Sequence, residues 1–158
     1  MSLKILKKQL ILCGSMSYYN DFVQIKRHLS DLGIKCIIPA SDVQYELQLK
    51  KEAFDDYKRS MSYKYITKIK QLETIGVLIY NPEKHGIQNY IGPNTFAEIA
   101  VAFSTKKRIF IYYDLPSVYY EELTSWRCSC YKGNYLKLYE DIHEYFQIEN
   151  AQLELFNE

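Results

Sequence analysis

The sequence predicts a single α/β domain with a parallel sheet of four to five strands and helices on both faces. Short apolar runs alternate along the chain with segments in which apolar residues recur every three or four positions. Strands separated by helices favour a parallel sheet with right-handed crossovers, and we expect strand order 2-1-3-4-5. The 158 residues, 47% hydrophobic and 25% charged, are enough for one core. We assign one domain to residues 1–158: a core over about 9–115, closing elements over 116–150 and a tail over 151–158.

The amino-terminal third predicts a strand, a helix and a second strand. Residues 9–13 form a short apolar run that a glycine–serine turn ends, which is typical of a buried strand. The next segment predicts a helix that ends at Gly33, because its apolar residues are spaced by three or four positions: Phe22, Ile25, Leu29 and Leu32. Residues 34–38 predict the second strand, which Pro39 closes.

The middle of the chain predicts a polar helix followed by a strand and an irregular loop. Residues 43–72 favour helix, with many charged side chains that indicate a solvated face and a possible break near residues 60–62. Residues 75–80 predict the third strand. Residues 81–93 are too rich in Gly, Pro and Asn for regular structure.

The last elements begin with a helix that contains Glu98, followed by a fourth strand over residues 108–113. After residue 116 the pattern weakens. We expect a fifth strand near residues 126–131, a closing helix over residues 136–146, and fraying of the last ten residues.

Composition and cysteine spacing exclude several classes of protein. The net charge of +1 gives no electrostatic argument for binding a nucleic acid polymer or an anionic membrane. The longest apolar runs are too short to span a bilayer, and the start of the chain lacks a leader pattern, so we expect a cytoplasmic protein. Cys128 and Cys130 lack the second ligand pair of a structural zinc site, while Cys13 and Cys36 fit small core residues. We expect neither a metal nor a cofactor.

Glu98 is the one charged residue between Gly86 and Thr105. A carboxylate in so apolar a segment loses solvation on folding and needs compensation. One interpretation is a capping box, with Thr95 as N-cap and Glu98 three residues later. The other is a nucleophile or general base in a pocket, with a pKa shifted by partial burial.

The helix around Glu98 is apolar on two sides. A helical wheel predicts a core face of Phe96, Ile99, Ala100 and Phe103. Glu98 and Asn94 lie on the other side, which Ala97, Val101 and Ala102 also make apolar. Such a helix is buried on both sides, on one by its own domain and on the other by a neighbour or a pocket wall. We therefore expect a lined cavity and a homodimer or larger homo-oligomer.

The predicted topology brings this helix close to the turn after the first strand. In open parallel sheets, ligands bind outside the carboxyl ends of the strands. Residues 14–17, residues 81–94 and Asp114 all fall at that edge. A glycine in such a turn permits close approach of the backbone, and free N–H groups at the next helix favour an anion such as phosphate. Neither the Walker A lysine nor a G-x-G-x-x-G spacing is present.

The chain contains 16 tyrosines, some of them in adjacent pairs. The pairs at residues 18–19, 112–113 and 119–120 could line a nucleobase or sugar pocket, because tyrosine has a flat apolar face and a polar tip. Compositional bias is the simpler interpretation for most of them.

Two segments resemble the nucleoside 2-deoxyribosyltransferase-like superfamily, which includes the 2′-deoxynucleoside 5′-monophosphate N-glycosidases. Residues 10–16 resemble its first strand and loop, and residues 89–103 resemble its glycine loop, glutamate and small-residue helix. Residues 106–111 also fit, so the resemblance spans about residues 9–115. It implies a flavodoxin-like, Rossmann-like domain that acts as an oligomer with pockets shared between subunits.

The resemblance also implies a reaction. The family glutamate, matched by Glu98, attacks the anomeric carbon of a nucleoside or nucleotide and expels the base, and water or another base resolves the glycosyl-enzyme. Substrate binding then falls to residues of the two matching segments: Gly14, Ser15, Met16, Asn94 and Thr95.

One position departs from the family pattern. The active glycosidases carry an aspartate on the helix before the third strand, where this chain has Tyr65 with Lys64 and Lys68 nearby. Two hypotheses follow: an N-glycosidase or deoxyribosyltransferase, or a non-catalytic module that binds a nucleotide or nucleoside derivative.

Overall fold

A computed structural model, described here for residues 7–41 and 50–155, contains one five-stranded parallel sheet in the order β2-β1-β3-β4-β5. The strands are β1 (Gln9–Gly14), β2 (Lys35–Ile37), β3 (Thr74–Tyr80), β4 (Arg108–Ile111) and β5 (Ser129–Cys130). The helices are the short 3₁₀ helix η1 (Met16–Tyr18), α1 (Tyr19–Asp31), α3 (Lys51–Lys70), α4 (Pro93–Ser104), α5 (Tyr120–Ser125) and α6 (Tyr135–Leu155). The predicted fold class and strand order are confirmed.

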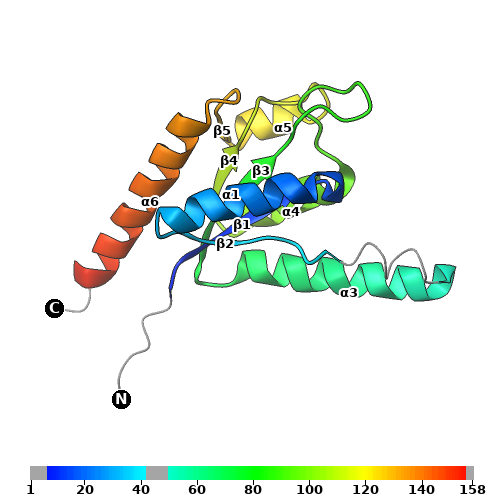
Figure 1. The fold of residues 1–158 in the computed structure, drawn as a ribbon, viewed down its shortest axis with the longest axis horizontal. Coiled ribbons are helices and arrows are strands. Elements are labelled where there is room, and N and C mark those ends of the chain that lie inside the picture. The colour runs from blue at the N-terminus through cyan, green and yellow to red at the C-terminus, as the bar shows by residue number, and fades with distance from the viewer. Residues whose placement is uncertain (1–6, 42–49, 156–158) are drawn as a thin grey trace, which may run out of the picture.

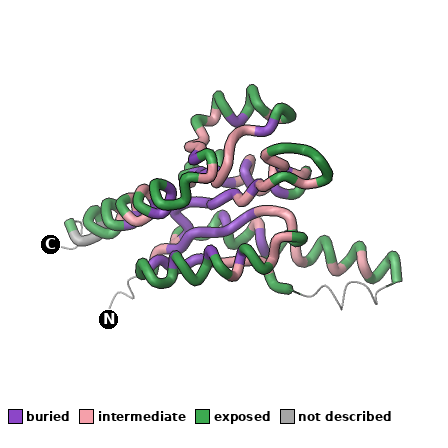
Figure 2. Tube along the Cα trace, turned by 45° about the horizontal axis from the view of Figure 1, so that its top comes forward, coloured by how far each residue is buried: buried purple, intermediate pink, exposed green. Residues whose placement is uncertain are grey.

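Helices cover the sheet on both faces, and the strands form the buried centre of the molecule (Figures 1 and 2). Because side chains alternate along a strand, Leu10 and Leu12 of β1 join one core cluster, while Ile11 and Cys13 join the other. The first cluster contains residues of α1 and α6, and the second contains residues of α3, α4 and α5. The amino-terminal part of α3 extends past the sheet (Figure 1).

Two predicted helices differ from the observed ones in length. α3 continues without a break through residues 60–62, and residues 43–49 of the predicted helix lie outside the described residues. α6 runs to Leu155, so the fraying predicted for the last ten residues is wrong over residues 149–155. Helix α5 was not predicted, since its six residues are too few for a periodic pattern.

The end of α1 explains one misplaced core residue. Leu32 continues the apolar repeat of this helix, yet its side chain is exposed, because the helix ends at Asp31. Gly33 then adopts a φ of +76°, a left-handed conformation that residues with a Cβ rarely adopt. The chain therefore turns away from the helix axis two residues after the helix ends.

No helix in residues 7–41 and 50–155 is long and apolar enough to cross a membrane.

Candidate functional site

Helix α4 begins earlier than the capping-box interpretation requires. Its N-cap is Gly92, in an extended conformation, and Pro93 is the first helical residue. Proline is favoured there because its φ suits a helix and its missing N–H would have no helical partner. Thr95 is therefore already inside the first turn, and the prediction of a Thr95–Glu98 capping box is wrong.

The buried stripe of α4 lies beside Glu98 instead of opposite it. Its members are Thr95, Ile99 and Ala102. Phe103, predicted to be a core residue, is 46% exposed and stacks on Trp126, with ring centroids 4.8 Å apart. Phe96 is only partly buried and stacks on Tyr119 at 4.0 Å. The two phenylalanines thus pack against the segment around α5, and the sheet-facing side of the helix is the one that adjoins Glu98.

A cavity of about 360 Å³ lies at the carboxyl end of β1, with α3 on one side and α4 on the other. From α4 it is lined by Asn94, Thr95 and Glu98. The end of β1 and the residues after it contribute Gly14 and Met16, and the residues after β2 contribute Pro39 and Ala40. Helix α3 supplies the remaining wall with Phe54, Tyr57, Lys58, Met61, Ser62, Lys64, Tyr65 and Lys68. The wall predicted on the second side of α4 is thus supplied by α3 of the same chain.

Four of the five residues assigned to substrate binding line this cavity together with Glu98. Ser15 is the exception, and its hydroxyl has other partners. Its Oγ accepts hydrogen bonds from the Lys84 Nζ at 2.7 Å and from the backbone N–H of Ser17 at 3.4 Å. The serine caps the short helix η1 and connects the turn after β1 to the loop after β3.

Gly14 is required by packing within the protein. A Cβ at this position would lie 2.6 Å from the carbonyl oxygen of Tyr80 and 3.1 Å from the ring of Phe22. The sequence analysis expected Gly14 to permit close approach to a ligand. In the structure its close neighbours are β3 and α1. Gly14 still contributes to the cavity wall.

Partial burial dominates the electrostatics of Glu98. Loss of solvation raises the pKa of this carboxyl from 4.5 to about 7, and a hydrogen bond with the Cys13 thiol offsets part of the shift. Burial, together with the nearby Glu98, holds the pKa of Cys13 well above its usual value. Within the described part of the chain, the ion pairs are those of Lys137 with Glu140 and Asp141, so no cation is paired with Glu98.

Tyr65, which the sequence analysis aligned with a family aspartate, has a hydroxyl that is bonded to the backbone. It donates to the carbonyl oxygen of Leu12 and lies 3.4 Å from that of Ile37. Burial is the main cause that raises the pKa of this phenol well above its usual value. Of the described residues that line the cavity, Glu98 alone carries a carboxylate.

Three lysines of α3 line the same cavity as Glu98: Lys58, Lys64 and Lys68. The sequence prediction placed Lys58 on a solvated face. The helical spacing of Lys58, Met61, Tyr65 and Lys68 would have revealed a shared face, but the side of α3 that meets α4 depends on tertiary packing.

The loops at this edge are held together by a buried amide that the sequence prediction did not single out. The Asn81 Nδ2 donates to the carbonyl oxygens of Asp114 at 2.8 Å and Asn89 at 3.3 Å, and its Oδ1 accepts from the Tyr113 N–H. Asp114 lies at the expected edge, but its carboxylate accepts from the Leu115 N–H and does not line the cavity.

Among residues 7–41 and 50–155, no group of three or more His, Cys, Asp or Glu side chains is arranged to hold a metal ion. Comparisons with protein-family models, with curated proteins and with solved structures gave no match for this chain.

Proposed function

We propose that this chain is an N-glycosidase or 2-deoxyribosyltransferase that cleaves the N-glycosidic bond of a nucleoside or nucleotide, with Glu98 as the nucleophile. One observation carries the proposal: a partly buried carboxylate with a pKa of about 7 borders a cavity of about 360 Å³. The cavity lies at the carboxyl edge of a parallel sheet, where ligands of such folds bind. Asn94, one turn before Glu98, would orient the carboxylate or a sugar hydroxyl.

The proposed reaction has two displacements. An oxygen of Glu98 bonds to the anomeric carbon as the bond to the base nitrogen breaks, and the base leaves with the bonding electrons and takes a proton from solvent. Water then attacks the same carbon, loses a proton to solvent, and displaces the carboxylate. In the transfer reaction, a nitrogen of a second base replaces the water. This chemistry uses the carboxylate and the two substrates and needs no cofactor.

The lysines of α3 favour a phosphorylated substrate. Lys58, Lys64 and Lys68 place three positive charges on the wall formed by α3, whereas Glu98 lies on the wall formed by α4. A 5′-monophosphate placed at the lysines would leave its sugar between the two helices. Charge-assisted hydrogen bonds to phosphate are among the strongest polar contacts in binding sites.

A second candidate is a non-catalytic module that binds a nucleotide or nucleoside derivative in the same cavity. Two observations favour it: the cavity has a single carboxylate among its described residues, and the Tyr65 hydroxyl is occupied by backbone carbonyls. Glycosidases generally use two carboxyl groups, one of which protonates the leaving group or activates water. Without the second group, binding would continue while turnover is lost.

We also propose that the chain acts as a homo-oligomer in the cytoplasm. The support is the resemblance and one aromatic side chain of α3, that of Tyr63, which is 74% exposed. Light scattering at micromolar concentration is expected to show a dimer or larger species. A monomer at these concentrations would contradict this part of the proposal alone.

The function is tested by measuring the release of free base from nucleosides, nucleoside 5′-monophosphates and NAD by chromatography. The glycosidase proposal predicts release from at least one of them, with 5′-monophosphates favoured over nucleosides. Saturable binding of a nucleotide without release would support the binding module. If the protein neither releases base nor binds any of these compounds, both candidate functions are contradicted.

A further inference from the structure

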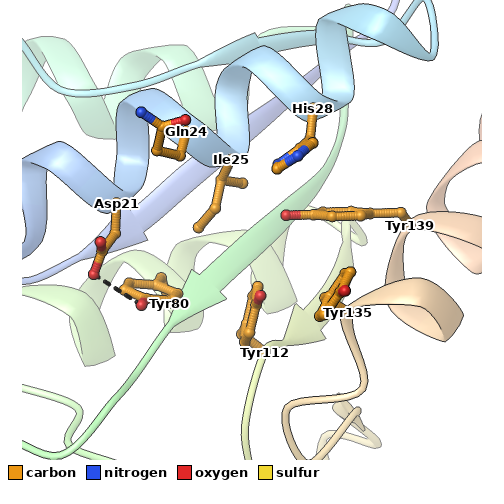
Figure 3. A pocket seen from close by; sticks show the side chains of 8 residues that line it. All are labelled: Asp21, Gln24, Ile25, His28, Tyr80, Tyr112, Tyr135 and Tyr139. Atoms are coloured by element: carbon orange, nitrogen blue, oxygen red, sulfur yellow. Dashed lines mark hydrogen bonds between the residues drawn. The ribbon is translucent and has the colours of Figure 1, made fainter.

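A second cavity, of about 210 Å³, lies on the opposite face of the sheet from Glu98, between α1 and the start of α6 (Figure 3). Four tyrosines contribute to its lining: Tyr80, Tyr112, Tyr135 and Tyr139. Tyr80 ends β3 and Tyr112 follows β4, so the cavity lies at the carboxyl edge of the sheet. Asp21 and His28 of α1 complete its polar lining together with Gln24. The proposed glycosidase chemistry uses none of these residues.

The tyrosine rings that line this open cavity are inclined to one another in two neighbouring pairs. The rings of Tyr80 and Tyr112 are nearly perpendicular, at 87°, with centroids 5.1 Å apart. Those of Tyr135 and Tyr139 are inclined at 57°, with centroids 6.2 Å apart. A flat nucleobase stacks best between parallel rings, whereas inclined rings suit a small rounded group. The volume is also below the roughly 300 Å³ at which ordinary small-molecule pockets begin.

Asp21 supplies the one carboxylate among the described residues that line this cavity. Burial, followed by the hydrogen bond to Asp21, raises the pKa of Tyr80 above its usual value, and burial does the same for Tyr112 and Tyr139. These phenols are therefore neutral near pH 7, and the carboxylate of Asp21 supplies the charge. No lysine or arginine is among the described residues that line the cavity.

One hydrogen bond occupies part of the polar lining of this cavity. The Tyr80 Oη donates to the Asp21 Oδ2 at 2.9 Å, as the dashed line in Figure 3 shows. This is the one side-chain hydrogen bond among the described residues that line the cavity. The rest of the lining combines the faces and edges of aromatic rings with the Asp21 carboxylate and the polar side chains of Gln24 and His28. A positive charge is attracted by such rings within about 6 Å of their centroids.

We propose that this cavity binds a small quaternary or methylated ammonium ion, with its charge near Asp21 and its methyl groups against the tyrosine rings. The methyl groups of such a cation are apolar and suit the tyrosine rings, and its positive charge suits the Asp21 carboxylate. A neutral molecule of the same shape would gain the apolar contacts without the electrostatic attraction.

The test is a calorimetric titration at pH 8 with choline, tetramethylammonium and 3,3-dimethyl-1-butanol, the neutral analogue of choline. We expect saturable binding of the two cations, and affinity for the neutral analogue weaker by about tenfold or more. Asp21→Asn still accepts the Tyr80 hydroxyl and is expected to weaken choline binding by a similar factor. Tyr135→Leu removes one half-exposed ring and is expected to weaken it severalfold.

Two control variants separate this site from the rest of the molecule. Tyr120→Leu alters an exposed tyrosine of α5 that does not line the cavity, and it is expected to bind choline as the parent does. Glu98→Gln is also expected to bind choline unchanged, because its cavity lies on the other face. Equal binding of the neutral analogue, unchanged binding by Asp21→Asn, or no saturable binding of either cation at about 50 mM would overturn the proposal.

Discussion

The hydroxyl of Tyr65 donates a hydrogen bond to the backbone carbonyl of Leu12 and thereby joins α3 to the carboxyl end of β1. The same hydroxyl approaches the carbonyl of Ile37, so one side chain connects the helix to the ends of two adjacent strands. This anchor holds α3 beside Gly14 and Glu98 across a shared cavity. Tyr65 therefore has a structural reason to be a tyrosine, independent of catalysis.

The first prediction concerns this anchor. Tyr65→Phe keeps the buried ring but leaves the Leu12 carbonyl without its donor, so the free energy of unfolding should fall by about 1–3 kcal/mol. Urea denaturation measures the change. Tyr63→Phe, at a position 74% exposed on the same helix, should stay within about 0.5 kcal/mol of the parent. Equal stability of the two variants would contradict the role of the hydroxyl.

The second prediction concerns Glu98 as nucleophile. Glu98→Gln keeps the side-chain length but cannot accept a glycosyl group as a carboxylate, so base release should fall by about three orders of magnitude or more while the fold is retained. Chromatography measures release, and circular dichroism checks folding. Glu122→Gln, an exposed residue of α5, serves as the matched control and should release base at the parent rate. Release by Glu98→Gln at the parent rate would exclude Glu98 as the nucleophile.

The third prediction concerns pH. Folding raises the pKa of Glu98 from 4.5 to about 7, so the folded protein holds this proton more tightly than the unfolded chain does. The stabilisation is fully present below pH 4.5 and is lost as the pH rises through 7. The stability of the parent relative to Glu98→Gln should therefore decrease between these pH values and be constant outside them. Denaturation of both proteins across this range measures the difference in their free energies of unfolding. The same pH dependence in both proteins would contradict the raised pKa of Glu98.

The raised pKa also predicts how activity depends on pH. The nucleophile must be ionised, so kcat/KM should rise with pH and level off above about 7. A plateau reached already near pH 5 would indicate that a different group titrates, or that Glu98 is ionised at its ordinary pKa.

The fourth prediction concerns the lysines of α3. Lys68→Gln should raise KM for a nucleoside 5′-monophosphate by about tenfold and leave KM for the corresponding nucleoside nearly unchanged. Lys70→Gln changes an exposed lysine two residues away that does not line the cavity, and it should affect neither substrate. Equal losses for nucleoside and nucleotide would mean that Lys68 does not contact phosphate.

Much of the fold follows from patterns that are local in the chain. Buried strands such as β1 and β3 are continuous apolar runs, and α1 has a clear three- and four-residue repeat. Their alternation predicts the parallel sheet, its strand order and the edge at which Glu98 lies. The two-residue strand β5 lies inside the longer range predicted for it, residues 126–131, whereas the six-residue helix α5 was not predicted because it is too short for periodicity to be informative.

The sequence by itself also identified Glu98, because a single carboxylate in an apolar segment can be recognised without knowing its tertiary contacts. Its surroundings were decided by tertiary structure. Ser15 is bonded to Lys84, and Lys58 lines the cavity from a helix whose charges had predicted a solvated face. Each of these outcomes depends on residues far away in the chain, as Tyr65 and Leu12 do across 53 positions. Local periodicity predicts the secondary structure of a segment, whereas the tertiary contacts of a side chain are determined only when separate segments pack together.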